Sequence, residues 1–89
     1  MNRKEITIVN KLGLHARAAA KFVQVASGFQ AEINVYSDHK EVSGKSIMGI
    51  MMLAAGIGSS IEIKTIGADE DEAMTAIESL INNKFGEDE

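Results

Sequence analysis

Two apolar periodicities alternate along this chain, and their order constrains the fold more than any other feature of the sequence. Segments in which every second residue is apolar are typical of half-buried strands. Segments with apolar residues three and four positions apart, such as Ala19, Phe22, Val23 and Ala26, are typical of helices that bury one face. Together the patterns predict strands over 5–9, 32–36, 40–42 and 61–66, and helices over 16–26, 46–56 and 69–84.

The predicted element order is βαββαβα. The turn at 37–39 makes a hairpin of the second and third strands. Such a mixed order favours an α+β fold, an open-faced sandwich in which three helices cover one face of a four-stranded, mainly antiparallel sheet. With 89 residues and no linker or repeat, we expect one domain over 1–89.

The composition excludes several classes of function. The chain has no cysteine, so disulfides and thiol nucleophiles are absent. No apolar run reaches the ~20 residues of a membrane helix, and the first residues do not resemble a signal peptide. We therefore expect a cytoplasmic protein that does not insert into membranes.

Charge is distributed unevenly along the sequence. Residues 1–49 carry seven Lys/Arg against four Asp/Glu, a net +3, whereas residues 50–89 carry two against nine, a net −7. The first half is therefore expected to present positive potential to an anionic partner. Nucleic acid is not expected as that partner, because the four aromatic residues and the dispersed cations form neither a stacking platform nor a basic stripe.

His15 is the residue best placed for chemistry, because it stands where the first helix begins. Amides at a helix start favour an anion and disfavour an imidazolium, so we expect a neutral, nucleophilic ring whose phosphoryl adduct those amides can hold. Arg17 offers a guanidinium suited to phosphate, and Gly13 is expected to leave room for a second protein. The alternative is an ordinary helix cap. No metal-ligand spacing or catalytic triad surrounds His15.

The segment Gly13-Leu14-His15-Ala16-Arg17-Ala18-Ala19 resembles the active-site signature of the HPr family, the histidine-containing phosphocarriers of the bacterial phosphotransferase system. Length, element order and the motif over 44–49 extend the resemblance to the whole chain. It implies that His15 accepts a phosphoryl group at Nδ1 from enzyme I and donates it to enzyme IIA domains, that Arg17 assists, and that no cofactor takes part. Ala18 stands where many members have proline, but alanine also suits a first helical turn.

Ser46, in Gly44-Lys45-Ser46, invites a second interpretation. A nucleotide-binding P-loop would need a glycine at position 39, which is His39. The residue pattern instead predicts that Ser46 caps the second helix. The family resemblance adds that Ser46 is a regulatory phosphorylation site for an HPr kinase/phosphorylase in bacteria that have one.

The second helix also predicts a partner-binding surface. Its stripe of Ile50, Leu53, Ala54 and Ile57 is expected to face the sheet, which leaves other apolar side chains uncovered. The predicted contact residues are Leu14, Ala16, Lys21, Lys45, Ile47, Met48, Met51 and Met52.

We expect a monomeric carrier that is not an enzyme in its own right. One alternative is a regulatory phosphocarrier of the nitrogen-related branch of the same family. Another is an α+β adaptor or ligand-sensing module that never carries phosphate. The carboxylates over 69–72 are assigned to the helix dipole, and the tail over 86–89 is expected to fray.

Overall fold

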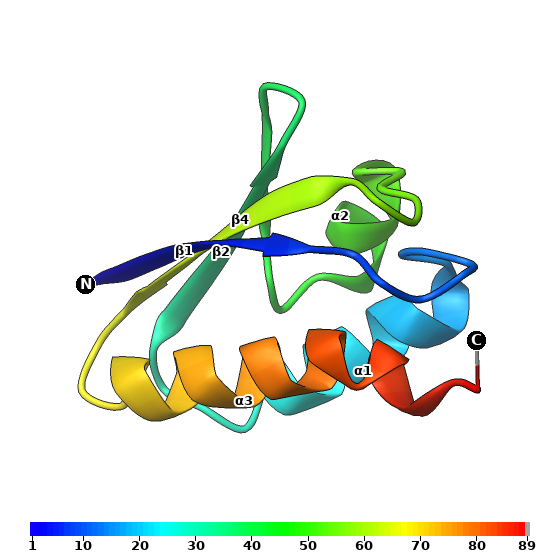
Figure 1. The fold of residues 1–89 in the computed structure, drawn as a ribbon. Coiled ribbons are helices and arrows are strands. Elements are labelled where there is room, and N and C mark those ends of the chain that lie inside the picture. Colours follow the sequence, from blue (N-terminus) through cyan, green and yellow to red (C-terminus); the bar gives the residue numbers. More distant parts are fainter. Residues whose placement is uncertain (89) are drawn as a thin grey trace.

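A computed structural model describes residues 1–88 (Figure 1). Four strands and three α-helices follow the predicted order, with one 3₁₀ turn added at the end. Their bounds are β1 Asn2–Thr7, α1 Ala16–Ala26, β2 Glu32–Ser37, β3 Lys40–Ser43, α2 Ile47–Met52, β4 Ser60–Ile66, α3 Glu70–Asn82 and η1 Lys84–Gly86.

The sheet has the order β1-β4-β2-β3, and every neighbouring pair is antiparallel. The register places Ile6 opposite Ile61 and Ile63 opposite Val35, so one face of the sheet is a continuous apolar surface. The α+β sandwich with three helices is thereby confirmed, and the sheet is antiparallel throughout. β1 begins earlier than predicted and ends at Thr7, after which Ile8 pairs with the 58–59 loop.

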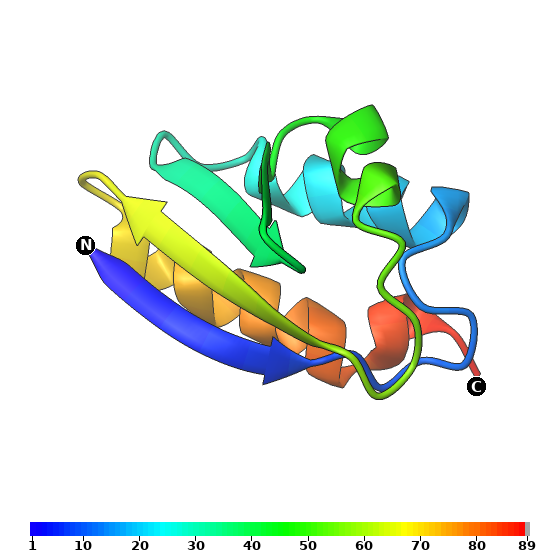
Figure 2. The same cartoon turned by 90° about the horizontal axis from the view of Figure 1, so that it is seen from above.

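α1 and α3 lie side by side under the apolar face of the sheet, with α3 running behind β1 and β4 in Figure 2. α1 has the predicted bounds, because Ala-rich sequence favours helix and Ser27-Gly28 ends it. The largest fully buried side chains include Phe22 of α1 and Ile77 of α3. Among the helices of residues 1–88, none is long and apolar enough to cross a membrane.

α2 is shorter than predicted, and part of its assigned inner face was wrong. It ends at Met52, and Ala54 has a φ of 52°, which breaks the helical repeat. Ile50 and Leu53 are buried as expected, but Ala54 is exposed and Ile57 is 59% exposed. Ala55 is buried in their place, because beyond the helix end the 3.6-residue period no longer decides which side chain faces inward.

The predicted fraying of the tail is also wrong for residues 86–87, whose backbone amides bond the Asn83 and Lys84 carbonyls; Glu89 lies outside the described residues. η1 follows α3 and buries Phe85 completely. Lys21 of α1 donates from Nζ to the Phe85 carbonyl at 2.6 Å. A buried aromatic anchor and a charge-assisted hydrogen bond therefore hold the tail against the start of α1.

Candidate functional site

The loop between β1 and α1 is fixed by its packing against the loop that follows α2. Gly13 is buried with a φ of +66°, and a Cβ there would lie 2.5 Å from the Ala55 carbonyl oxygen. The next amide, that of Leu14, donates to the same oxygen at 3.0 Å. Gly13 is thus required by close backbone packing, and the expectation that it leaves room for a partner is corrected.

Leu14 must also be corrected as a predicted partner contact. Its side chain is only 5% exposed and belongs to the hydrophobic core. Its place beside His15 suggested a surface contact, but the side chain packs into the core and anchors the loop there. Ala16, in contrast, is exposed at the first position of α1.

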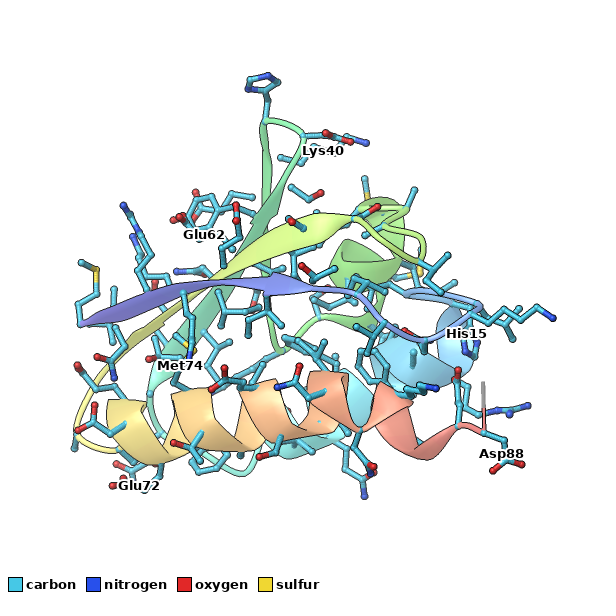
Figure 3. All side chains as sticks on the ribbon, in the orientation of Figure 1. His15, Lys40, Glu62, Glu72, Met74 and Asp88 are labelled. Atoms are coloured by element: carbon cyan, nitrogen blue, oxygen red, sulfur yellow. The ribbon has the colours of Figure 1, made fainter. Side chains whose placement is uncertain are left out.

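His15 is the N-cap of α1, and the two nitrogens of its ring have different partners. Its backbone is extended, and its Nδ1 accepts a hydrogen bond from the Arg17 amide at 3.3 Å. The side chain is 26% exposed at the end of the molecule where α1 begins, beside the C-terminal tail and Asp88 (Figure 3). The cap interpretation and the nucleophile interpretation therefore describe the same geometry, since a capping Nδ1 carries an available lone pair.

The second ring nitrogen, Nε2, meets a carboxylate from the tail. Glu87 Oε2 lies 2.5 Å from His15 Nε2, and the Glu87 side chain is 10% exposed. Burial raises the pKa of the Glu87 carboxyl, but hydrogen bonds from Asn10 and His15, with the positive charge of Arg17 nearby, outweigh burial and lower that pKa below its usual value. An ionised carboxylate can only accept, so a hydrogen bond between Glu87 Oε2 and His15 Nε2 requires the proton on Nε2.

Asn10 completes this arrangement from inside the protein. It is fully buried, and its Nδ2 donates to Glu87 Oε1 at 3.0 Å and to the Gly13 carbonyl at 2.8 Å. Neither Glu87 nor Asn10 is marked as a site residue by the sequence, since 77 positions separate them. The available signal was Phe85, an isolated aromatic after the last helix, which is more typical of an anchored tail than of a frayed one.

The predicted cations do not form one free patch. Arg17 is exposed and lines a shallow pocket with Leu12, Glu87 and Asp88. Lys21 is engaged with the Phe85 carbonyl, as described above, and Lys45 Nζ donates to the Phe29 carbonyl at 2.8 Å. Of these three cations, Arg17 is the one whose charge acts beside His15, at the pocket that it lines with Glu87.

The uncovered apolar face of α2 is present as predicted. Met48 is 70% and Met52 63% exposed, with Ile47 and Met51 partly exposed beside them. α2 packs against α1 and flanks its start in Figures 1 and 2. Ser46 caps α2, because its Oγ accepts from the Gly49 amide at 3.1 Å.

Carboxylates at the opposite end of the molecule have structural partners. Asp69 accepts from the amides of Gln30 and Ala31, which ties the start of α3 to the start of β2. Glu70 pairs with the amino terminus of Met1. Within residues 1–88, no group of three His, Cys, Asp or Glu side chains is arranged to hold a metal ion.

Comparison with known proteins agrees with this architecture. Residues 2–83 match the family model described as "PTS HPr component phosphorylation site". The chain belongs to the HPr family of the phosphotransferase system. The phosphocarrier protein HPr of Neisseria meningitidis serogroup A is 57% identical over 89 residues, and the match covers both chains completely.

Solved HPr structures share the whole fold. The crystal structure of HPr-C-His from Thermoanaerobacter tengcongensis superposes with a TM-score of 0.95 at 49% identity, covering 100% of each chain. A crystal structure of an HPr dimer from the same organism gives 0.78 at 50% identity, covering 98% of this chain and 100% of that one. The likeness therefore extends to elements on every side of the histidine.

Proposed function

We propose that this HPr-family chain works as a single-domain phosphocarrier in the cytoplasm, taking a phosphoryl group on His15 Nδ1 from phospho-enzyme I and passing it to enzyme IIA domains. The observation that carries the proposal is that the two ring nitrogens have different partners: Nε2 lies against the Glu87 carboxylate, and Nδ1 accepts from the Arg17 amide at the start of α1. The chain is both substrate and donor in this scheme, and it turns over only by meeting other proteins.

The surroundings of Nδ1 support a phosphoryl adduct. The Arg17 amide that now donates to Nδ1 would instead donate to a phosphate oxygen, and the positive end of the α1 dipole would favour the added charge. The exposed Arg17 guanidinium offers a second, charge-assisted contact. A phosphate oxygen would thus take the place of Nδ1 as the acceptor of the Arg17 amide. It is the stronger acceptor, and the backbone would not have to rearrange.

The exposed face of α2 supports transient docking next to this nucleophile. Apolar side chains over Ile47, Met48, Met51 and Met52 adjoin the start of α1, and unbranched methionines adapt to differently shaped partners. We propose that this face and Ala16 contact enzyme I and enzyme IIA domains in turn. Lys21 and Lys45 contribute there only if a partner displaces them from the carbonyls they now hold.

The deciding experiment is phosphoryl transfer from labelled phosphoenolpyruvate through purified enzyme I. The chain should become labelled, and the label should be lost in acid, as a phosphoramidate is, and absent from the His15→Ala variant. Comparing the enzyme I of the sugar branch with that of the nitrogen-related branch assigns the pathway. An unlabelled wild-type protein with both enzymes would overturn the proposal in favour of a module that carries no phosphate.

We further propose that the chain acts as a monomer and that Ser46 is a regulatory phosphorylation site for an HPr kinase/phosphorylase. Ser46 is partly exposed at the start of α2, next to the docking face. Added phosphate would place about two negative charges beside a surface that partners must contact. Light scattering of the purified protein tests the monomer, against the dimer seen for the related HPr.

A further inference from the structure

Asn10 is a fully buried polar side chain that bonds both the β1–α1 loop and the C-terminal tail. Both of its amide hydrogens are used, one on the Gly13 carbonyl and one on Glu87, while its Oδ1 has no partner among the described residues. A buried, unpaired oxygen lowers stability, so an asparagine kept here needs a compensating role. Turning the amide over would set Oδ1 against two other acceptors, so both neighbours fix its orientation.

The two carboxylate oxygens of Glu87 have different hydrogen-bond partners. Oε1 accepts from Asn10 and Oε2 from His15 Nε2. Because a carboxylate is planar, fixing one oxygen fixes the direction of the other. Phe85 and Lys21 hold the backbone of the tail, but neither sets the rotation of the Glu87 side chain. Asn10 is the group that does.

We propose that Asn10 is a positioning residue that acts through Glu87 to determine which ring nitrogen of His15 is phosphorylated. The inference rests on the function proposed above. A neutral imidazole has one N–H and one lone pair. Glu87 held by Asn10 keeps the proton on Nε2 and leaves the lone pair on Nδ1. Without that hydrogen bond Glu87 can turn towards Arg17 or solvent, and Nε2 becomes a competing nucleophile.

Phosphoramidate, a small phosphoryl donor, tests this without any partner protein. The Nδ1 lone pair forms the new N–P bond while the P–N bond of the donor breaks, ammonia leaves with the hydrogens it already carries, and the Nε2 proton stays in place. Nitrogen-15 NMR of the labelled histidine distinguishes Nδ1 from Nε2 adducts. In unreacted protein at alkaline pH, the same spectra report which nitrogen carries the proton.

Wild type should react at Nδ1 and hold its proton on Nε2, with a preference of at least about tenfold, the equivalent of one charge-assisted hydrogen bond. Asn10→Ala should reduce that preference, and so should Glu87→Ala, which leaves the core untouched. Adding Asn10→Ala to Glu87→Ala should change nothing further, because Asn10 acts through Glu87. Thr65→Ala is the matched control, since Thr65 is equally buried and bonds the Glu70 carbonyl far from His15.

Three results would overturn the inference. The first is an unchanged preference in Asn10→Ala in both the adducts and the tautomers. The second is an additive effect in the double variant, and the third is an equal loss of preference in Thr65→Ala, which would mean general loosening of the fold. These outcomes are separate from failure of the proposed function, which would show as no labelling by enzyme I whatever the tautomer of His15.

Discussion

At the scale of single residues, His15 depends on side chains that are distant in sequence and on one glycine beside it. Nδ1 is presented to the start of α1, while Nε2 is held by a tail residue whose own position is set from the β1–α1 loop. That loop keeps its shape because Gly13 lies against Ala55. Substitution of Gly13 should therefore lower the free energy of unfolding and, through the loop, disturb the orientation of the His15 ring.

Gly13→Ala should cost about 2 kcal/mol or more of unfolding free energy. The residue has a left-handed φ of +66°, and the new Cβ would overlap the Ala55 carbonyl oxygen. Gly58→Ala is the matched control, because Gly58 has a φ of +86° but open space around its Cβ, so only the conformational cost of about 1 kcal/mol applies. Urea unfolding measures both; equal losses would contradict the packing role of Gly13.

At the scale of elements, α2 contributes both a cap and a surface. Its six residues are too few to be stable alone, so Ser46 at its start and Ile50 and Leu53 beneath it must hold it in place. The remaining face is exposed, and it is the face proposed to meet partners. Stability and docking should therefore respond to different substitutions within one short helix.

Met48→Asp should impair transfer from enzyme I by about tenfold or more while leaving the melting temperature unchanged, because a side chain that is 70% exposed contributes little to the core but can anchor an interface. Ile66→Asp is the control: Ile66 is 40% exposed at the end of β4, away from the start of α1 (Figure 1). Single-turnover kinetics provide the measurement. Unchanged kinetics in Met48→Asp would remove α2 from the docking surface.

Ser46→Ala should lower the unfolding free energy by about 1 kcal/mol, since the Gly49 amide loses its acceptor. Phosphoserine at 46 should leave the melting temperature nearly unchanged, because a negative charge is favourable at a helix start, yet slow transfer from enzyme I. Calorimetry and transfer assays on the same samples separate the two effects. A large drop in melting temperature on phosphorylation would show that the modification acts on the fold.

At the scale of the whole molecule, contacts between segments that are distant in sequence stabilise both the end of the molecule that holds His15 and the opposite end. The tail docks against α1 beside His15, and Asp69 and Glu70 fasten α3 to β2 and to the amino terminus at the other end. The sequence halves do not map onto two surfaces, because the acidic tail lies beside His15. The positive potential expected from the first half is therefore offset beside His15 by the carboxylate of Glu87.

Acid should weaken the fold partly through Asp69. The hydrogen bond from Gln30, and then that from Ala31, lower the pKa of Asp69 more than burial raises it. Its contribution is therefore complete above the ordinary aspartate pKa of about 3.9 and is lost as the pH falls through the lower folded value. Asp69→Asn should be less stable than wild type near neutrality, and the difference should shrink below about pH 4.

Urea unfolding across this pH range measures the Asp69 effect. Glu72→Gln, an exposed carboxylate in the first turn of α3, is the control: it loses only its interaction with the helix dipole and should show a smaller pH-dependent difference from wild type than Asp69→Asn does. A constant difference between Asp69→Asn and wild type at all pH values would mean that the charge of Asp69 does not contribute.

The sequence by itself determined the element order, the four-stranded α+β sandwich, the cap at Ser46 and the position of His15 at the start of α1. These features depend on local periodicity and on residues next to one another, which a linear pattern contains. It also found the apolar residues that α2 leaves uncovered, although the helix end at Met52 was missed because Ala54 takes a left-handed backbone conformation.

Only the tertiary structure decided what surrounds the histidine. Gly13 and Leu14 serve packing, Lys21 holds the tail, and Asn10 and Glu87 meet across 77 positions to orient the ring. Such contacts depend on how a sheet, two helices and a terminal turn bring remote segments to one point. No local pattern records which remote segments meet, so the position of His15 at the helix start could be predicted from the sequence while the orientation of its ring could not.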